Sequence, residues 1–142
     1  ECGVPGPLCR RGDSGAGQIC KACNQLVIGG TLAAVGEAFA LARKTGVDPA
    51  KVRAALLGGF ASSRVLEVHG ERLIQRNFKP GFRARLYRKD LRIVMGEAHR
   101  LGLMLPSAAA TAQVFNAMVG SGMGEDDSIA ALKLLEKMST PD

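Results

Sequence analysis

The chain has 142 residues, which is enough for one domain of ordinary size and too few for two. A hydrophobic fraction of 46% with 23% charged residues excludes a wholly disordered chain. Its 19 Lys and Arg against 13 acids give a net charge of +6, which attracts the phosphates of nucleotides, nucleic acids or membrane surfaces without choosing among them. Aromatic residues make up only 4%, so we expect a mainly aliphatic core, packed between helices.

The first part of the chain predicts a lead-in followed by one long helix. Residues 1–13 are rich in Gly and Pro without hydrophobic periodicity, so we expect a mobile lead-in or truncation remnant before a domain at 14–142. Ser14 is a good N-cap, and a helix is predicted over 18–44, with residues 45–46 as its stop. We expect this helix to be the buried centre of the domain, with another helix close to its glycines. The residues that follow the helical period are Ile19, Ala22, Cys23, Leu26, Val27, Gly30, Ala33, Ala34, Glu37 and Leu41.

The remaining chain predicts five shorter helices. Asp48 followed by Pro49 is a typical helix start, and Gly58 and Gly59 end that helix after about residue 57. Further helices are predicted from Ser62 or Ser63 to about 76, over 85–101, from Pro106 or Ser107 to about 119, and from Asp126, Asp127 or Ser128 to about 138. Residues 77–82 form a turn around Pro-Gly, and 120–124 a flexible loop. Because nothing indicates a strand, we expect an all-α domain of about six helices built on one long N-terminal helix.

Cysteine content and hydropathy favour a cytoplasmic protein. The four cysteines, Cys2, Cys9, Cys20 and Cys23, are too few and too clustered for a secreted disulfide framework. Cys20 and Cys23 lack the second pair or His cluster that a zinc site needs, so no metal is expected. The longest weakly polar stretch, 26–36, is about half of the ~20 apolar residues that a bilayer requires, and there is no signal-peptide pattern.

The densest group of candidate functional residues lies at 15–25. Lys21 and Asn24 are three residues apart, so they project from one face of a helix with Gln25 beside them. A lysine can donate or accept a proton, and a neighbouring amide can hold a hydroxyl or carboxylate in place. From spacing alone, an ordinary surface lysine is the more frequent explanation.

A basic cluster and two histidines are the other candidates. The cluster, within 72–92, has three interpretations: a solvated surface, a site for cofactor phosphates, or a nucleic-acid surface, which is disfavoured because stacking aromatics are nearly absent. His69 and His99 lack partners at metal-ligand spacing and are expected to be surface or half-buried residues without a catalytic role. No Gly-x-Gly-x-x-Gly follows a strand, so no dinucleotide-binding unit is expected in this chain. The cluster comprises Arg72, Arg76, Lys79, Arg83, Arg85, Arg88, Lys89 and Arg92.

Five motifs occur in order along the chain. They are Gly-Ala-Gly-Gln-x-x-Lys-Ala-x-Asn-Gln (15–25), Gly-Gly-x-Ala-x-Ser (58–63), Asn-Phe-Lys-Pro-Gly-Phe (77–82), Lys-Asp-Leu (89–91) and Leu-Gly-x-x-Leu-Pro (101–106). Over 14–138 this series resembles the C-terminal domain of the β-hydroxyacid dehydrogenases, the family of 3-hydroxyisobutyrate dehydrogenase and tartronate semialdehyde (2-hydroxy-3-oxopropionate) reductase. The 77–82 string is most similar to the reductase branch. The resemblance implies a helical domain of the 6-phosphogluconate dehydrogenase C-terminal type, which binds a small hydroxyacid or semialdehyde and forms a homodimer or larger assembly.

The resemblance also assigns roles to individual residues. Lys21 matches the catalytic lysine, the general acid that protonates the carbonyl oxygen as hydride arrives. Asn24 matches an amide that orients the substrate, and Asp90 lies in the same cleft as a further substrate-binding residue. Lys89 and Phe82 match positions that contact the cofactor, NAD or NADP.

The Rossmann domain of the family has no counterpart in this sequence. We therefore expect the cofactor to be bound mainly by that other domain, and this chain on its own to be inactive. After Lys89 the family has small residues where this sequence has Arg-Ile-Val-Met at 92–95, which weakens the assignment of cofactor contacts there. The competing class is a non-enzymatic helical module that associates with itself or with anionic partners through the basic cluster.

Overall fold

The computed structural model describes residues 15–139, and within this range the fold is all-α, as predicted. The helices are α1 (Ala16–Lys44), α2 (Pro49–Leu57), α3 (Arg64–Ile74), α4 (Ala84–Leu101), α5 (Pro106–Gly120), the short 3₁₀ helix η2 (Ser128–Ala130) and α6 (Ala131–Met138). The described part contains no strand, and its β-type pairing is one isolated bridge between Arg83 and Asp127. The predicted lead-in, the Ser14 cap and the first two cysteines lie outside the described residues.

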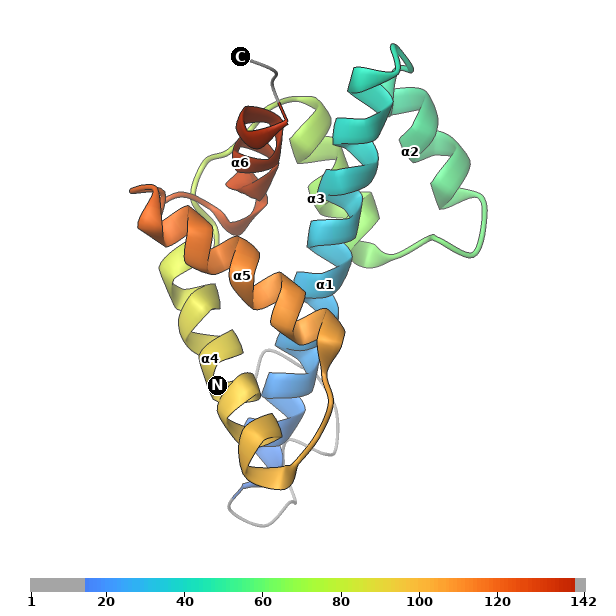
Figure 1. Ribbon diagram of the computed structural model, residues 1–142. Helices are drawn as coiled ribbons and strands as arrows, with labels where there is room; N and C mark the ends of the chain where they lie inside the picture. The colour runs from blue at the N-terminus through green and yellow to red at the C-terminus, as the bar shows by residue number, and fades with distance from the viewer. Residues whose placement is uncertain (1–14, 140–142) are drawn as a thin grey trace.

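Helix α1 is the centre of the domain, as predicted, and each of the other five α-helices contacts it (Figure 1). The predicted buried stripe on α1 is wrong, because Ile19, Val27 and Leu41 are 50%, 62% and 65% exposed. Small and apolar residues occupy most faces of this helix, so hydrophobic periodicity alone could not identify the face that is buried. The residues of α1 that are buried are Gln25, Gly29, Leu32, Val35, Gly36, Phe39 and Ala42.

Three of the predicted helix starts are confirmed, two of them by side-chain caps. At α2 the Asp48 side chain accepts a hydrogen bond from the Ala50 backbone N–H at 2.9 Å. At α3 the Ser63 hydroxyl accepts from the Leu66 N–H at 3.0 Å. Pro106 is the first residue of α5, where its missing N–H costs no helical hydrogen bond. These three starts were readable from sequence because each depends on local chemistry.

Several helix boundaries differ from the predictions, since α1 begins at Ala16 rather than 18 and α4 at Ala84 rather than 85. Helix α3 ends at Ile74 rather than near 76, because Arg76 adopts a left-handed backbone conformation with φ of +53° that turns the chain toward the 77–82 loop. The last helix is preceded by the 3₁₀ turn η2, whose cap is Asp127. Of the three predicted caps, Asp127 is thus the N-cap of η2, whereas α6 itself follows Ala130 and has no side-chain cap.

The core is more aromatic than composition suggested. Phe39 and Phe115 are among its largest fully buried side chains, and the Tyr87 ring stacks on Phe115 with centroids 4.5 Å apart. A Cβ atom on Gly29 would lie 2.9 Å from the Tyr87 ring and 3.2 Å from the Thr111 methyl. The predicted close helix contact at a glycine of α1 is thus found at Gly29, where α4 and α5 both approach.

An ion-pair group ties α6 to α1 and to the end of α3. Glu136 binds Arg43 of α1, and both of its oxygens accept from Arg76, each at 3.1 Å. Partial burial opposes ionisation of Glu136, but the hydrogen bonds and charges of Arg76 and Arg43 outweigh it, so the pKa of Glu136 lies below its ordinary value of 4.5.

Acid should therefore weaken the fold partly through Glu136. Because its folded pKa is depressed, its contribution is present above the unfolded pKa of 4.5 and is lost as pH falls through the folded pKa. We expect Glu136→Gln to lower the urea midpoint at pH 7, with a difference from wild type that shrinks below pH 4.5. Glu37→Gln, which removes the same charge at an exposed position of α1, is the matched control. A difference that stays constant with pH would contradict this prediction.

Within residues 15–139, α1 is long and apolar enough to cross a membrane when judged by length and composition alone. In this fold, however, 39% of its most apolar 18-residue window is buried against the other helices. The central helix of a packed domain meets the same criteria, so the observation assigns no membrane role to α1.

Candidate active site

Two neighbouring cavities meet at Lys21, in the second turn of α1. The larger has a volume of about 480 Å³ and the smaller about 190 Å³. Lys21 and Gln25 line both of them. The larger cavity is also lined by Asn24 of α1, His69 and Arg72 of α3, Phe82 of the following loop, and Tyr87 of α4; the smaller also by Lys89 and Asp90 of α4.

The structure brings all five predicted site residues to these cavities. Lys21, Asn24 and Phe82 lie on the larger cavity, and Lys89 and Asp90 lie with Lys21 on the smaller. Lys21 and Lys89 are exposed, whereas the Asp90 side chain is buried. The arrangement places two ammonium groups and one carboxylate around a shared opening, which suits an anionic carbonyl compound.

Gln25 connects the predicted residues of α1 to those of α4. Its side-chain amide donates to the Asp90 carboxylate at 3.0 Å, and its side-chain oxygen accepts from Asn24 at 3.4 Å. Gln25 is itself buried. Because each hydrogen bond restricts the next group, the series from Asp90 through Gln25 fixes the orientation of the Asn24 amide beside Lys21. Sequence reasoning placed Gln25 on the correct face but gave it no role.

Tyr87 holds the same turn of α1 from the other side. Its hydroxyl donates to the Gln25 backbone carbonyl at 2.9 Å, and Phe82 packs edge-on against its ring at a centroid distance of 5.4 Å. Burial, and then the negative charge of Asp90, raise the pKa of Tyr87, so the phenol stays protonated and remains a donor. Tyr87 therefore sets the distance between α1 and α4 at the site.

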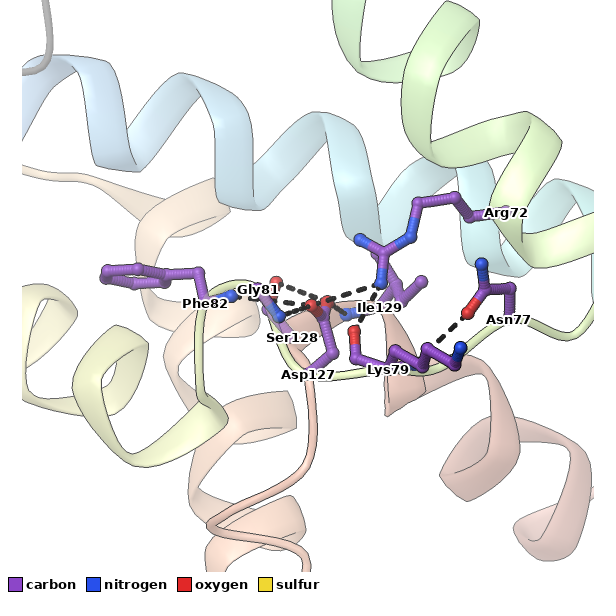
Figure 2. Close-up of polar contacts among 8 residues, drawn as sticks. All are labelled: Arg72, Asn77, Lys79, Gly81, Phe82, Asp127, Ser128 and Ile129. Carbon is purple, nitrogen blue, oxygen red and sulfur yellow. Dashed lines mark hydrogen bonds and ion pairs between the residues drawn. The ribbon is translucent and has the colours of Figure 1, made fainter.

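The Asn-Phe-Lys-Pro-Gly-Phe loop is held in place by Asp127 (Figure 2). This carboxylate is 1% exposed, and its Oδ2 accepts from the backbone N–H groups of Gly81 at 2.6 Å and Phe82 at 3.4 Å. Arg72 binds the same oxygen at 3.3 Å and also donates to the Lys79 carbonyl at 2.6 Å. The other carboxylate oxygen caps η2. Asp127 thus places Phe82 at the cavity, a role that no local sequence signal indicated.

Both histidines have the predicted exposure, but sequence analysis did not place His69 at a cavity. His69 is half-buried on α3 and lines the larger cavity, whereas His99 is exposed. The Nδ1 atom of His69 is buried and is the unsatisfied buried side-chain polar atom found among residues 15–139.

Four arginines of the predicted basic cluster form ion pairs with acidic side chains, whereas Arg88, Lys89 and Arg92 of α4 are exposed. The acidic partners offset part of the positive charge that a binding module for anionic partners would use. The ion pairs are Arg72–Asp127, Arg76–Glu136, Arg83–Glu125 and Arg85–Glu125.

Comparison with known proteins supports one family for this chain. The family model described as NAD-binding of NADP-dependent 3-hydroxyisobutyrate dehydrogenase matches residues 15–135. The 2-hydroxy-3-oxopropionate reductase of Escherichia coli K12 is 46% identical over 90% of the chain. A probable mitochondrial 3-hydroxyisobutyrate dehydrogenase-like protein of Arabidopsis thaliana is 35% identical over 90% of the chain. The chain spans 44% and 38% of the lengths of these two relatives.

Solved structures agree with the sequence comparison. A 3-hydroxyisobutyrate dehydrogenase from Salmonella typhimurium matches 84% of this chain and 42% of its own, with a TM-score of 0.81 and 28% identity. One from Mycobacterium tuberculosis, solved with L-serine, matches 85% of this chain and 44% of its own, with a TM-score of 0.78 and 26% identity. The helical fold, the matched span and these relatives together show that the chain belongs to the 3-hydroxyisobutyrate dehydrogenase family of NAD(P)-dependent oxidoreductases.

Proposed function

We propose that this chain is the substrate-binding, helical half of an NAD(P)-dependent reductase of 2-hydroxy-3-oxopropionate (tartronate semialdehyde), working in the cytoplasm. The observation that supports it most is the 46% identity to the E. coli reductase, against 35% to the Arabidopsis dehydrogenase-like protein. The convergence of Lys21, Asn24 and Asp90 on adjoining cavities is consistent with this activity.

The chain offers part of a site for a nicotinamide cofactor. Lys89 presents an exposed ammonium at the smaller cavity, and Phe82 presents an aromatic side chain, 36% exposed, at the larger one. An exposed cation and an aromatic face suit the phosphates and rings of a dinucleotide, so Lys89 and Phe82 are the residues proposed to contact it. When bound, NAD(P)H supplies the hydride.

The remaining steps belong to residues of this chain. Lys21 holds the proton that the carbonyl oxygen needs as the alcohol forms, and its exposed ammonium on both cavities can reach a carbonyl in either. Asn24 orients the substrate, with its amide held by Gln25. Asp90 acts in the same cleft, where its carboxylate fixes Gln25.

The activity is tested by joining this chain to a cofactor-binding domain of the same family and following NADH or NADPH oxidation with 2-hydroxy-3-oxopropionate. We expect turnover by the joined protein and none by the 142-residue chain alone, because the nicotinamide must be positioned for hydride transfer. Turnover by the chain alone, above that of its Lys21→Ala variant, would contradict this division of roles.

We also propose that the chain associates with itself through the exposed side of α1. Ile19, Val27 and Leu41 project from that side, and apolar surface of this kind commonly marks an interface. We expect a dimer or larger by multi-angle light scattering at tens of micromolar, shifted toward monomer by Val27→Lys. Lys51→Glu, at an exposed position of α2, is the control. A monomeric wild-type chain at that concentration would refute the proposal.

A further inference from the structure

A separate cavity of about 300 Å³ lies between α4 and α5, two helices that pack against each other (Figure 1). It shares no lining residue with either cavity of the candidate active site. Its apolar lining residues are half-buried, and its four polar ones are exposed, so a ligand in the cavity can reach their side chains. The lining residues are Arg88, Arg92 and Met95 of α4 and Ala109, Ala112, Gln113 and Asn116 of α5.

The fold does not neutralise the positive charge of this cavity. Arg88 and Arg92 form no ion pair within the described part of the chain. The acidic side chains of α4 are engaged elsewhere, since Asp90 is buried on the side facing α1 and Glu97 binds Arg100. Helix α5 contains no charged residue. Because like charges one helical turn apart repel, an anion between the two arginines would stabilise this face.

The polar side chains are spaced to meet one ligand. Arg88 and Arg92 are four residues apart, which is about 6 Å along the axis of α4. Gln113 and Asn116 are three residues apart, so they project from one face of α5. A single carboxylate is satisfied by one guanidinium fork, whereas a phosphate group has more acceptor oxygens and up to two negative charges. Two guanidinium groups with two amide donors therefore suit a phosphate group better than a carboxylate.

We propose that this cavity binds the phosphate group of a small phosphate monoester. Arg88 and Arg92 hold the phosphate oxygens from α4. The side-chain amides of Gln113 and Asn116 complete the set of donors from α5. The half-buried apolar residues of the cavity contact the short carbon chain of the ligand. Since the site lies outside both cavities at Lys21, it is distinct from the substrate and cofactor positions proposed above and does not depend on them.

The first test is calorimetric titration of the 142-residue chain, at constant ionic strength, with inorganic phosphate, glycerol 3-phosphate and malonate. We expect the two phosphate ligands to bind at one site per chain, and malonate, a small dicarboxylate, to bind more weakly. Glycerol 3-phosphate should bind at least as tightly as inorganic phosphate, because its carbon chain adds apolar contact. No binding of either phosphate ligand, a monoester weaker than inorganic phosphate, or stronger binding of malonate would overturn the proposal.

Variants separate a built site from the effect of net charge. Arg92→Gln should weaken the binding of glycerol 3-phosphate roughly 10-fold or more, the usual effect of losing a hydrogen bond between charged groups. Arg92→Lys keeps the charge but not the planar fork, so its affinity should lie between those of wild type and Arg92→Gln. Lys51→Gln removes the same charge from an exposed position of α2 and should change the affinity little. Equal losses from Arg92→Gln and Lys51→Gln would overturn the proposal.

Chemical shifts locate the bound ligand. Glycerol 3-phosphate should shift the side-chain amide resonances of Gln113 and Asn116 in ¹H–¹⁵N spectra, while that of Gln75, at the end of α3, stays unchanged. Shifts confined to the amides of Asn24 and Gln25 would place the phosphate at the candidate active site instead and overturn the proposal. None of these measurements uses the reductase activity, so the proposed function is tested separately.

Discussion

Replacing Lys21 with alanine in the chain joined to a cofactor-binding domain of the same family is expected to lower kcat by about 10²- to 10⁴-fold, the usual contribution of a positioned general acid. Lys21 lines both cavities, and its side chain is exposed there. If it gives its proton to the carbonyl oxygen, the lost interaction is made mainly in the transition state. The affinity for the nicotinamide cofactor, measured by fluorescence titration, should therefore change little.

Two further variants separate proton donation from charge. Lys21→Arg keeps the positive charge, but guanidinium hardly releases a proton near neutral pH, so this variant should not recover activity. Lys89→Ala should weaken cofactor binding more than it slows turnover at saturation. If Lys21→Ala retains kcat within a few-fold of wild type, the catalytic assignment is wrong even though the fold and family remain.

The features that sequence predicted well are those set by neighbours along the chain. The Asp48 and Ser63 caps and Pro106 follow from local backbone chemistry, and their helices begin where expected. The projection of Lys21 and Asn24 from one face of α1 follows from their three-residue spacing. The ordered motifs added Phe82, which lines the larger cavity, and Lys89 and Asp90, which line the adjoining smaller one.

The features that sequence missed depend on which elements meet in space. In the sequence Gln25 is one more polar residue of a helix. Its role depends on Asp90 of α4, whose Oδ2 lies 3.0 Å from the Gln25 Nε2. His69 had no partner at any recognisable spacing, so the sequence could not show that it lines the larger cavity or that its Nδ1 is buried. The buried face of α1 could not be predicted because apolar residues occupy too many of its faces.

Asp127 shows how a residue without a motif can control the site, and its replacement should have the largest effect on stability. It lies 45 residues after Phe82, yet its carboxylate binds two backbone N–H groups of the 81–82 turn, Arg72 and the first turn of η2. Asp127→Ala would remove the acceptor of the Gly81, Phe82 and Ile129 N–H groups, and Arg72 would lose its carboxylate partner while keeping the Lys79 carbonyl. Removing one partner of a buried charged network typically costs about 3–5 kcal/mol.

We therefore expect Asp127→Ala to lower the free energy of unfolding of the chain by about 3–5 kcal/mol, measured by urea denaturation followed by far-UV circular dichroism. Asp127→Asn keeps one oxygen acceptor and the side-chain volume, so its loss should be smaller. Asp126→Ala is the matched control, because Asp126 holds Ala84 through its backbone carbonyl and not its side chain, and its change should stay within about 0.5 kcal/mol. If Asp127→Ala cost no more than this control, the backbone contacts between 82–85 and 124–128 would be sufficient to hold the loop, and Phe82 would keep its place at the cavity without the carboxylate.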